Sequence, residues 1–131
     1  MCSSSTMKQR RKLMAVCTSL FSAALVGGCV APVSDPDKLR AIRDEARMLA
    51  THHPLRPPND WVDVPVGRWP PTIASLEPHS VTVHSWGVDI SVKPYFDGGW
   101  GYHVAQNERR LPMPIGCYSE PLQDVFWHGP C

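Results

Sequence analysis

The sequence predicts a small two-layer α+β domain, in which one amphipathic helix packs on a four-stranded antiparallel sheet. Three observations lead to this class. The chain has 131 residues, which suits one domain at most. Apolar residues recur with the period of a helix before residue 54 and with a period of two after residue 80. One helix followed by strands with short turns is typical of an α+β fold.

The helix is expected between Asp35 and Pro54. Asp35 can act as the N-cap, and Pro36 suits the first helical position because an N–H there would have no partner. One stripe of the helix is apolar, at Leu39, Ile42, Ala46, Leu49 and Ala50. The remaining face is expected to meet solvent and carries Arg40, Asp44, Glu45 and Arg47. We interpret His52 and His53 as terminal residues of the helix rather than as metal ligands.

A proline-rich, extended segment is expected over residues 54–71, with Trp61 and Trp69 reaching into the core. A short helical segment is expected between Pro70 and Pro78.

Alternating apolar and polar residues predict the strands. Val81 and Val83 form one set, and Val88, Ile90 and Val92 form the next. A two-residue turn at Trp86 and Gly87 would pair Ser85 with Val88, Val83 with Ile90 and Val81 with Val92. The stretch FDGGW, residues 96–100, predicts a three-residue loop with Gly99 in the left-handed conformation; this loop would pair Phe96 with Trp100 and Val92 with Val104. The stretch DVFWH, residues 124–128, predicts the fourth strand.

Charge and motifs exclude several classes of function. From residue 29 onward the sequence has nine basic and twelve acidic residues, a balance of 9 − 12 = −3. This body has no basic patch for a phosphate backbone, so we expect no binding of nucleic acid. The zinc-protease, CxxC, serine-hydrolase and phosphate-loop motifs are missing from the sequence, so we expect no cofactor.

Three histidines lie on three predicted strands: His84, His103 and His128. The proposed register places His84 level with Asp89 but roughly 16 Å from His103, too far for a shared zinc ion. We therefore predict no metal site. A His84–Asp89 pair could orient an imidazole as a general base, but no Ser or Cys nucleophile is spaced to join it. We predict no catalytic residue and retain a small hydrolase as an alternative.

The N-terminus has the layout of an export signal. Basic residues at 8–12 precede an apolar stretch, and Val26-Gly27-Gly28-Cys29 resembles the lipobox of bacterial lipoproteins. The resemblance implies cleavage before Cys29 and lipid attachment to its thiol. It divides the chain into a signal peptide (1–28), a tether (29–35) and one periplasmic domain (36–131). An ordinary cleaved signal and an uncleaved membrane helix remain alternatives, and translation can begin at Met1 or Met7.

The same resemblance predicts where the protein is located in the cell. Val30 follows the cysteine in place of the Asp that is associated with inner-membrane retention, so we expect a lipid anchor in the bacterial outer membrane, facing the periplasm. We expect a non-enzymatic module that binds an envelope protein or a cell-wall partner; a periplasmic inhibitor or immunity protein is an alternative. Five aromatic residues could supply contact area: Trp86, Tyr95, Trp100, Tyr102 and Trp127.

Two cysteines remain once export and lipid attachment are granted, Cys117 and Cys131. Disulfides persist in an oxidising periplasm, and a turn near Pro121 would let the chain double back. We therefore predict a Cys117–Cys131 disulfide. The alternative is that the terminal Cys131 stays free or pairs between molecules.

Overall fold

The computed structural model describes residues 30–96, 98–106 and 110–131, so the predicted signal peptide and Cys29 lie outside the described residues. The elements follow the order α1 (Pro36–His52), β1 (Trp61–Asp63), η1 (Val66–Arg68), α2 (Pro71–Ala74), β2 (Ser80–His84), β3 (Gly87–Lys93), β4 (Trp100–Ala105), η2 (Ile115–Cys117), β5 (Tyr118–Leu122) and β6 (Val125–His128). Among the described helices, none has the length and apolar composition needed to cross a membrane.

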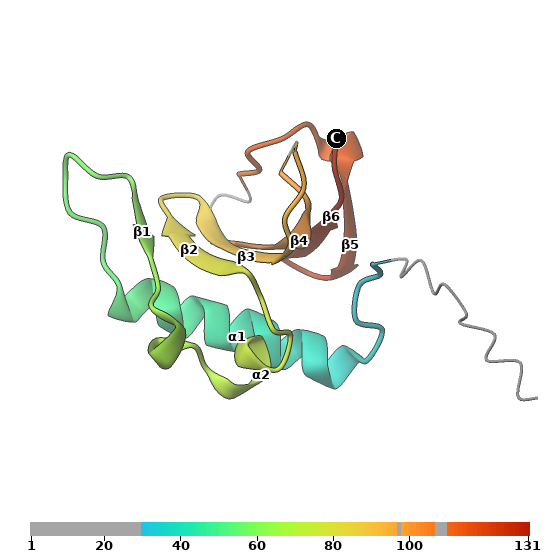
Figure 1. Cartoon of the computed structure of the whole chain (residues 1–131), viewed down its shortest axis with the longest axis horizontal. Coiled ribbons are helices and arrows are strands. Elements are labelled where there is room, and N and C mark those ends of the chain that lie inside the picture. The colour runs from blue at the N-terminus through green and yellow to red at the C-terminus, as the bar shows by residue number, and fades with distance from the viewer. Residues whose placement is uncertain (1–29, 97, 107–109) are drawn as a thin grey trace, which may run out of the picture.

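The sheet has six strands in the order β1-β2-β3-β4-β6-β5, and all neighbours are antiparallel. Helix α1 crosses one face of the sheet (Figure 1). The predicted α+β class is confirmed, but the predicted number of four strands is wrong. The two additional strands, β1 and β5, are the edges of the sheet. Their sequence signals are weak, because β1 has only three residues and β5 contains Pro121 within an irregular pairing.

Helix α1 follows the prediction closely. The Asp35 carboxylate accepts a hydrogen bond from the Asp37 N–H at 2.9 Å, and Pro36 occupies the first turn. The apolar stripe is buried at Leu39, Ile42, Ala46 and Leu49. His53 ends the helix, and its backbone N–H donates to the Leu49 carbonyl at 2.9 Å. This contact agrees with the terminal role assigned to His53.

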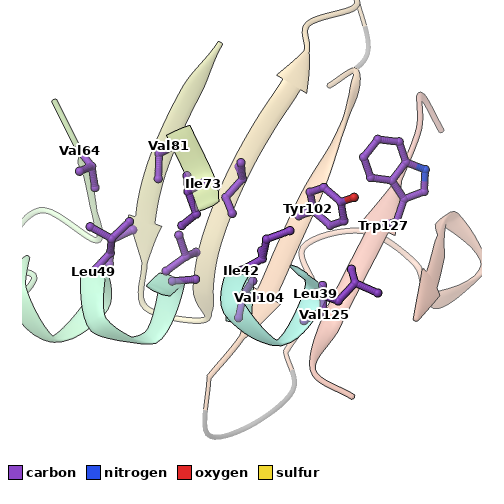
Figure 2. Close-up of a cluster of buried hydrophobic side chains, with 14 residues drawn as sticks. Leu39, Ile42, Leu49, Val64, Ile73, Val81, Tyr102, Val104, Val125 and Trp127 are labelled. Carbon is purple, nitrogen blue, oxygen red and sulfur yellow. The ribbon is translucent and has the colours of Figure 1, made fainter. Parts of the chain in front are cut away.

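The hydrophobic core lies between α1 and the covered face of the sheet (Figure 2). The sheet contributes Val81, Val83, Val88, Ile90, Tyr102, Val104, Val125 and Trp127. Trp69 packs against this core as predicted, and its indole N–H donates to the Val64 carbonyl at 2.9 Å. Trp61 does not reach the core and is 53% exposed. Strand alternation turns Val62 towards the core, so Trp61 faces the opposite side of an edge strand.

Both predicted hairpins form, but with other registers. The β2–β3 turn falls at Ser85 and Trp86, so that Val83 pairs with Val88 and Val81 with Ile90. This pairing is displaced by two residues from the prediction. The side chains keep their faces, because a shift by an even number of residues leaves the alternation unchanged.

The β3–β4 hairpin differs more. Val104 pairs with Val88 instead of Val92, and Lys93 pairs with Trp100, so the connection runs over 94–99 rather than three residues. Gly99 is left-handed as predicted, with φ of 72°. Pro94 explains the difference, since proline cannot donate to the sheet and Lys93 is therefore the last residue of β3.

Glu45 corrects the expectation of a uniformly solvated helix face. Its two carboxylate oxygens accept hydrogen bonds from the N–H groups of Thr72 at 3.0 Å and Ile73 at 2.8 Å. These N–H groups belong to the first turn of α2, which has no side-chain cap of its own. The carboxylate of α1 therefore caps α2 across the interface of the two helices.

We predict that Glu45→Ala lowers the free energy of unfolding by about 1 to 2 kcal/mol, because it leaves two N–H groups of α2 without an acceptor. Urea denaturation measures the change. The neighbouring exposed Asp44, whose partner is Arg43, serves as the control. Asp44→Ala should change stability by less than about 0.5 kcal/mol, and equal effects of both variants would contradict the capping role.

The described part of the predicted tether packs on the domain. Val30 and Val33 are partly buried against the core. The Val33 N–H donates to the Tyr102 hydroxyl at 2.6 Å. Packing against the core thus extends to residue 30, the first residue that the structure describes.

Candidate functional site

The face of the sheet opposite α1 carries a polar cluster on the neighbouring strands β2, β3 and β4. Thr82, Asp89 and His103 are level across β2, β3 and β4. His84 lies one alternation further along β2, on the same face. The antiparallel register therefore brings one carboxylate between two imidazoles.

Asp89 contacts both histidines. His84 Nε2 lies 3.1 Å from one carboxylate oxygen, and His103 Nδ1 lies 2.7 Å from the other. The His103 side chain is fully buried, whereas 31% of the Asp89 side chain is exposed. The predicted contact of His84 with Asp89 is present, but the predicted pairing is wrong: His84 lies level with Gly87, and Asp89 lies level with Thr82. The predicted separation of His103 is wrong, because it rested on a β3–β4 register four residues away from the one observed.

The surroundings of Asp89 keep its carboxyl group ionised. Burial alone would raise the pKa, but the hydrogen bonds and charges of His103 and His84 outweigh burial and lower it to about 2. The carboxylate is therefore charged at every pH near neutrality.

This lowered pKa predicts a pH-dependent contribution to stability. A pKa below its unfolded value of 3.8 stabilises the fold above that value, and the contribution is lost as the pH falls towards about 2. We expect Asp89→Asn to lower the free energy of unfolding by about 2 kcal/mol at pH 6. The difference from the parent chain should shrink between about pH 4 and pH 2. Urea titrations across this range test it, and a difference that does not vary with pH would contradict it.

The remaining nitrogens of both imidazoles are closed to solvent. His84 Nδ1 and His103 Nε2 are buried without a hydrogen-bond partner among the described residues. The His84 ring stacks on Trp86, with ring centres 4.8 Å apart. The His103 ring lies against Gly87, where a side chain would collide with it. Neither ring presents a nitrogen to a substrate.

A cavity of about 220 Å³ opens beside Asp89. Its polar lining comes from Asp89, Ser91, Tyr118 and His128. Ser91 and His128 flank Gly101 in one row of the sheet, and a side chain at Gly101 would lie 2.4 Å from the Ile90 carbonyl oxygen of β3. The wall of the cavity is completed by Gly98 of the β3–β4 connection and by Pro112 and Met113 of the connection before β5.

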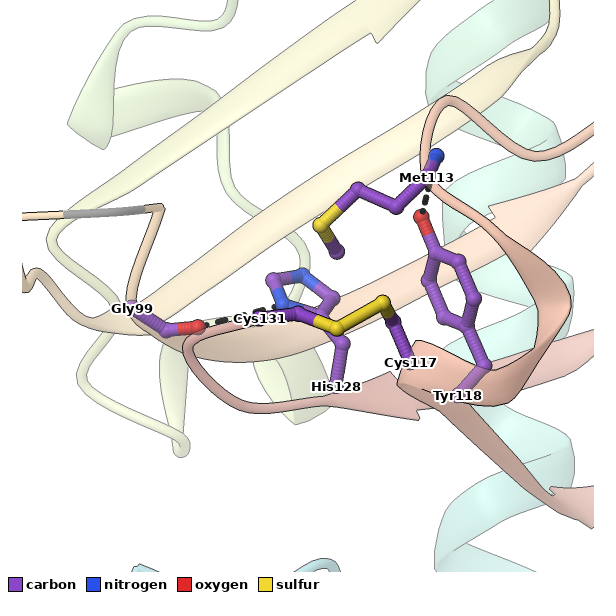
Figure 3. Close-up of a disulfide and its surroundings, with 6 residues drawn as sticks. All are labelled: Gly99, Met113, Cys117, Tyr118, His128 and Cys131. Carbon is purple, nitrogen blue, oxygen red and sulfur yellow. Dashed lines mark hydrogen bonds between the residues drawn. A yellow bond between two sulfur atoms is a disulfide. The ribbon is translucent and has the colours of Figure 1, made fainter.

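A disulfide and two hydrogen bonds hold this wall in place (Figure 3). Cys117 and Cys131 are bonded, as predicted, with Cα atoms 5.8 Å apart. The Met113 N–H donates to the Tyr118 hydroxyl at 3.3 Å. His128 Nδ1 lies 3.1 Å from the Gly99 carbonyl, so this nitrogen carries the proton and Nε2 is the acceptor of the neutral ring.

Two larger cavities also lie at the surface. One, of about 310 Å³, is lined by Trp86, Arg110, Leu111 and Pro112. The other, of about 300 Å³, lies at the β1 edge and is lined by His53, Pro54, Arg56, Asn59, Trp61 and Val62. Neither has a carboxylate in its described lining. The cavity beside Asp89 is therefore the strongest candidate site.

The described residues contain no group of three or more His, Cys, Asp or Glu side chains arranged to hold a metal ion. In the polar cluster each imidazole is turned to a different oxygen of Asp89, so the three side chains do not converge on one point. His128, the third histidine noted in the sequence, faces Gly99 rather than this cluster.

The five aromatic residues proposed as contact area do not form one surface. Tyr102 and Trp127 are buried in the core under α1. Trp86 and Trp100 are half-buried, and Tyr95 is exposed. The sequence could not separate them, because core and surface aromatic residues share the same alternation.

Comparison with protein-family models, with curated proteins and with solved structures finds no match to this chain.

Proposed function

We propose that this protein is a lipid-anchored lipoprotein of the bacterial outer membrane, and that its periplasmic domain is a non-enzymatic binding module. Its partner in the envelope presents a primary ammonium group. The observation that carries the binding proposal is the ionised Asp89 carboxylate at the wall of the 220 Å³ cavity. The lipobox-like sequence ending at Cys29 supports the proposed lipid anchor and location.

The groups lining the cavity suit an ammonium ion. Asp89, the Ser91 hydroxyl and His128 Nε2 are hydrogen-bond acceptors, matching the three N–H donors of a primary ammonium group. The Tyr118 ring adds an aromatic surface on which a cation is stabilised. When both imidazoles are neutral, each donates an N–H to Asp89 and the cluster keeps a net charge of −1. This charge favours a cation over a neutral or anionic ligand.

The same geometry supports binding over the alternative of a hydrolase that uses His84 and Asp89. A carboxyl group with a pKa of about 2 neither gives nor takes a proton at neutral pH. The free nitrogens of His84 and His103 are buried. Within the described part of the chain, no imidazole is hydrogen-bonded to Ser91, so this hydroxyl lacks an activating base.

Titration of the mature chain with n-butylammonium chloride, followed by NMR, tests the ligand class. We expect shifts at Asp89 and Ser91, with 1-butanol and butyrate giving none at matched concentration. Asp89→Asn should weaken butylammonium binding roughly tenfold or more, since hydrogen bonds to charged groups contribute about 1.5 to 3 kcal/mol. Asp63→Asn is the matched control, because Asp63 lies on the same face, where it accepts a hydrogen bond from Thr82. Equal responses to butanol and butylammonium would refute the ligand class.

Fatty-acid labelling of cells that express the full chain tests the anchor. The parent chain should carry label and fractionate with the outer membrane, whereas Cys29→Ser should lose the label and remain uncleaved. Label that persists in Cys29→Ser would refute lipid attachment at this residue. Cross-linking in intact cells then identifies the partner.

A further inference from the structure

The β3–β4 connection carries an exposed aromatic tip, defined here as Tyr95 and Phe96. Phe96 is 99% exposed and Tyr95 is 60% exposed. Tyr95 stacks edge-to-face on Trp100, with ring centres 5.6 Å apart. The Lys93 ammonium lies 5.3 Å from the centre of the same Trp100 ring. Two adjacent exposed aromatic side chains form a surface that favours an apolar partner.

The sheet places this tip at the end of the domain where the N-terminal segment docks. Trp100 follows the connection directly, and Tyr102 lies two residues further along β4. The Tyr102 hydroxyl holds the Val33 N–H. The docked segment and the aromatic tip therefore share the same end of β4.

The chain length between the docked segment and the lipid anchor is short. Val33 is four positions after Cys29 in the sequence, so even a fully extended chain places Cys29 within about 14 Å of the Val33 backbone. An acylated Cys29 would thus hold this end of the domain close to the bilayer, because the connection is too short to act as a long flexible linker.

We propose that the aromatic tip inserts into the same membrane surface that holds the Cys29 acyl chains, an inference that rests on the proposed lipid anchor. Tyr95 and Phe96 enter the headgroup region, where aromatic side chains are favoured. Lys93 meets anionic headgroups beside them. The contact gives the domain a fixed orientation on the membrane.

Vesicles of phosphatidylethanolamine and phosphatidylglycerol test the contact in two arms. In the first arm, the mature chain carrying Cys29→Ser, which lacks acyl chains, is sedimented with vesicles. It should bind measurably, and Tyr95→Ser with Phe96→Ser should lower its partition roughly tenfold or more, as expected for the loss of two buried aromatic side chains. Trp61→Ser is the control, because Trp61 is a half-exposed aromatic residue at the opposite end of the sheet, level with His84.

In the second arm, the acylated chain carries an environment-sensitive dye on Phe96→Cys or on Trp61→Cys and is reconstituted in the same vesicles. The dye at 96 should be quenched by nitroxide lipids, and the dye at 61 should not. Absence of vesicle binding in the first arm, or equal quenching at both positions, overturns the proposal. Since the first arm needs no acylation, its result stands even if the labelling experiment refutes the anchor at Cys29.

Discussion

Gly87→Ala is expected to lower the free energy of unfolding by about 3 kcal/mol or more. A side chain at this position would lie 2.3 Å from the Val104 carbonyl oxygen and 3.0 Å from the His103 ring. Gly87 also has φ of 151°, a conformation that residues with a side chain rarely adopt. The Val104 carbonyl belongs to the central β3–β4 pair, so it cannot move aside without breaking the sheet.

Urea denaturation of Gly87→Ala measures this loss, and NMR of the His103 ring reports the distortion of the polar cluster. Gly67→Ala is the control, because nothing lies within 4 Å of a side chain added there. Its stability should change by less than about 0.5 kcal/mol. If Gly87→Ala proved as stable as the control, the pairing of Gly87 with Ala105 would be refuted.

Removal of the disulfide should have the second largest effect. Cys117→Ser combined with Cys131→Ser is expected to lower stability by about 3 kcal/mol, because the bond closes a short loop and restricts the unfolded chain. The corresponding fall in Tm is roughly 10 °C or more for a domain of this size. The connection before β5, which ends at Cys117, would also lose its attachment to the C-terminus, so butylammonium binding should weaken in the same variant.

Calorimetry of the double variant, with the reduced parent chain as the control, tests this prediction. Mass analysis without reductant should show a monomer two protons lighter than its reduced form. Two free thiols in protein isolated without reductant would contradict the bond, as would an unchanged Tm in the double variant.

The local signals of the sequence predicted the helix and the bridge. Asp35, Pro36 and the apolar stripe define α1, because caps and helical periodicity act within a few residues. The pairing of Cys117 with Cys131 followed by elimination, since no other cysteine remains after the predicted processing. The alternation also assigned the correct faces to Val81, Val83, Val88 and Ile90.

The local signals failed where the structure depends on contacts between segments that are far apart in the sequence. Glu45 resembled a solvated helix residue, because its partners in α2 lie 27 and 28 residues away. Strand β1 has no periodic pattern, and only its pairing with β2 makes it a strand. Pro94 marks the end of β3 at Lys93, but it does not select Trp100 as the partner of Lys93.

At the candidate site, the sequence determined some features and only the tertiary structure decided the others. By itself the sequence determined which residues share the face opposite α1, including His84, Asp89 and His103, because strand alternation depends only on the parity of positions. Only the tertiary structure decided that Asp89 lies between the two imidazoles and beside a cavity. A register shift of two or four residues leaves every side chain on the same face of the sheet, so the alternation cannot distinguish these registers. The choice between such registers depends on the close fit of Gly87 and Gly101 against the neighbouring backbones and on the packing of the core under α1.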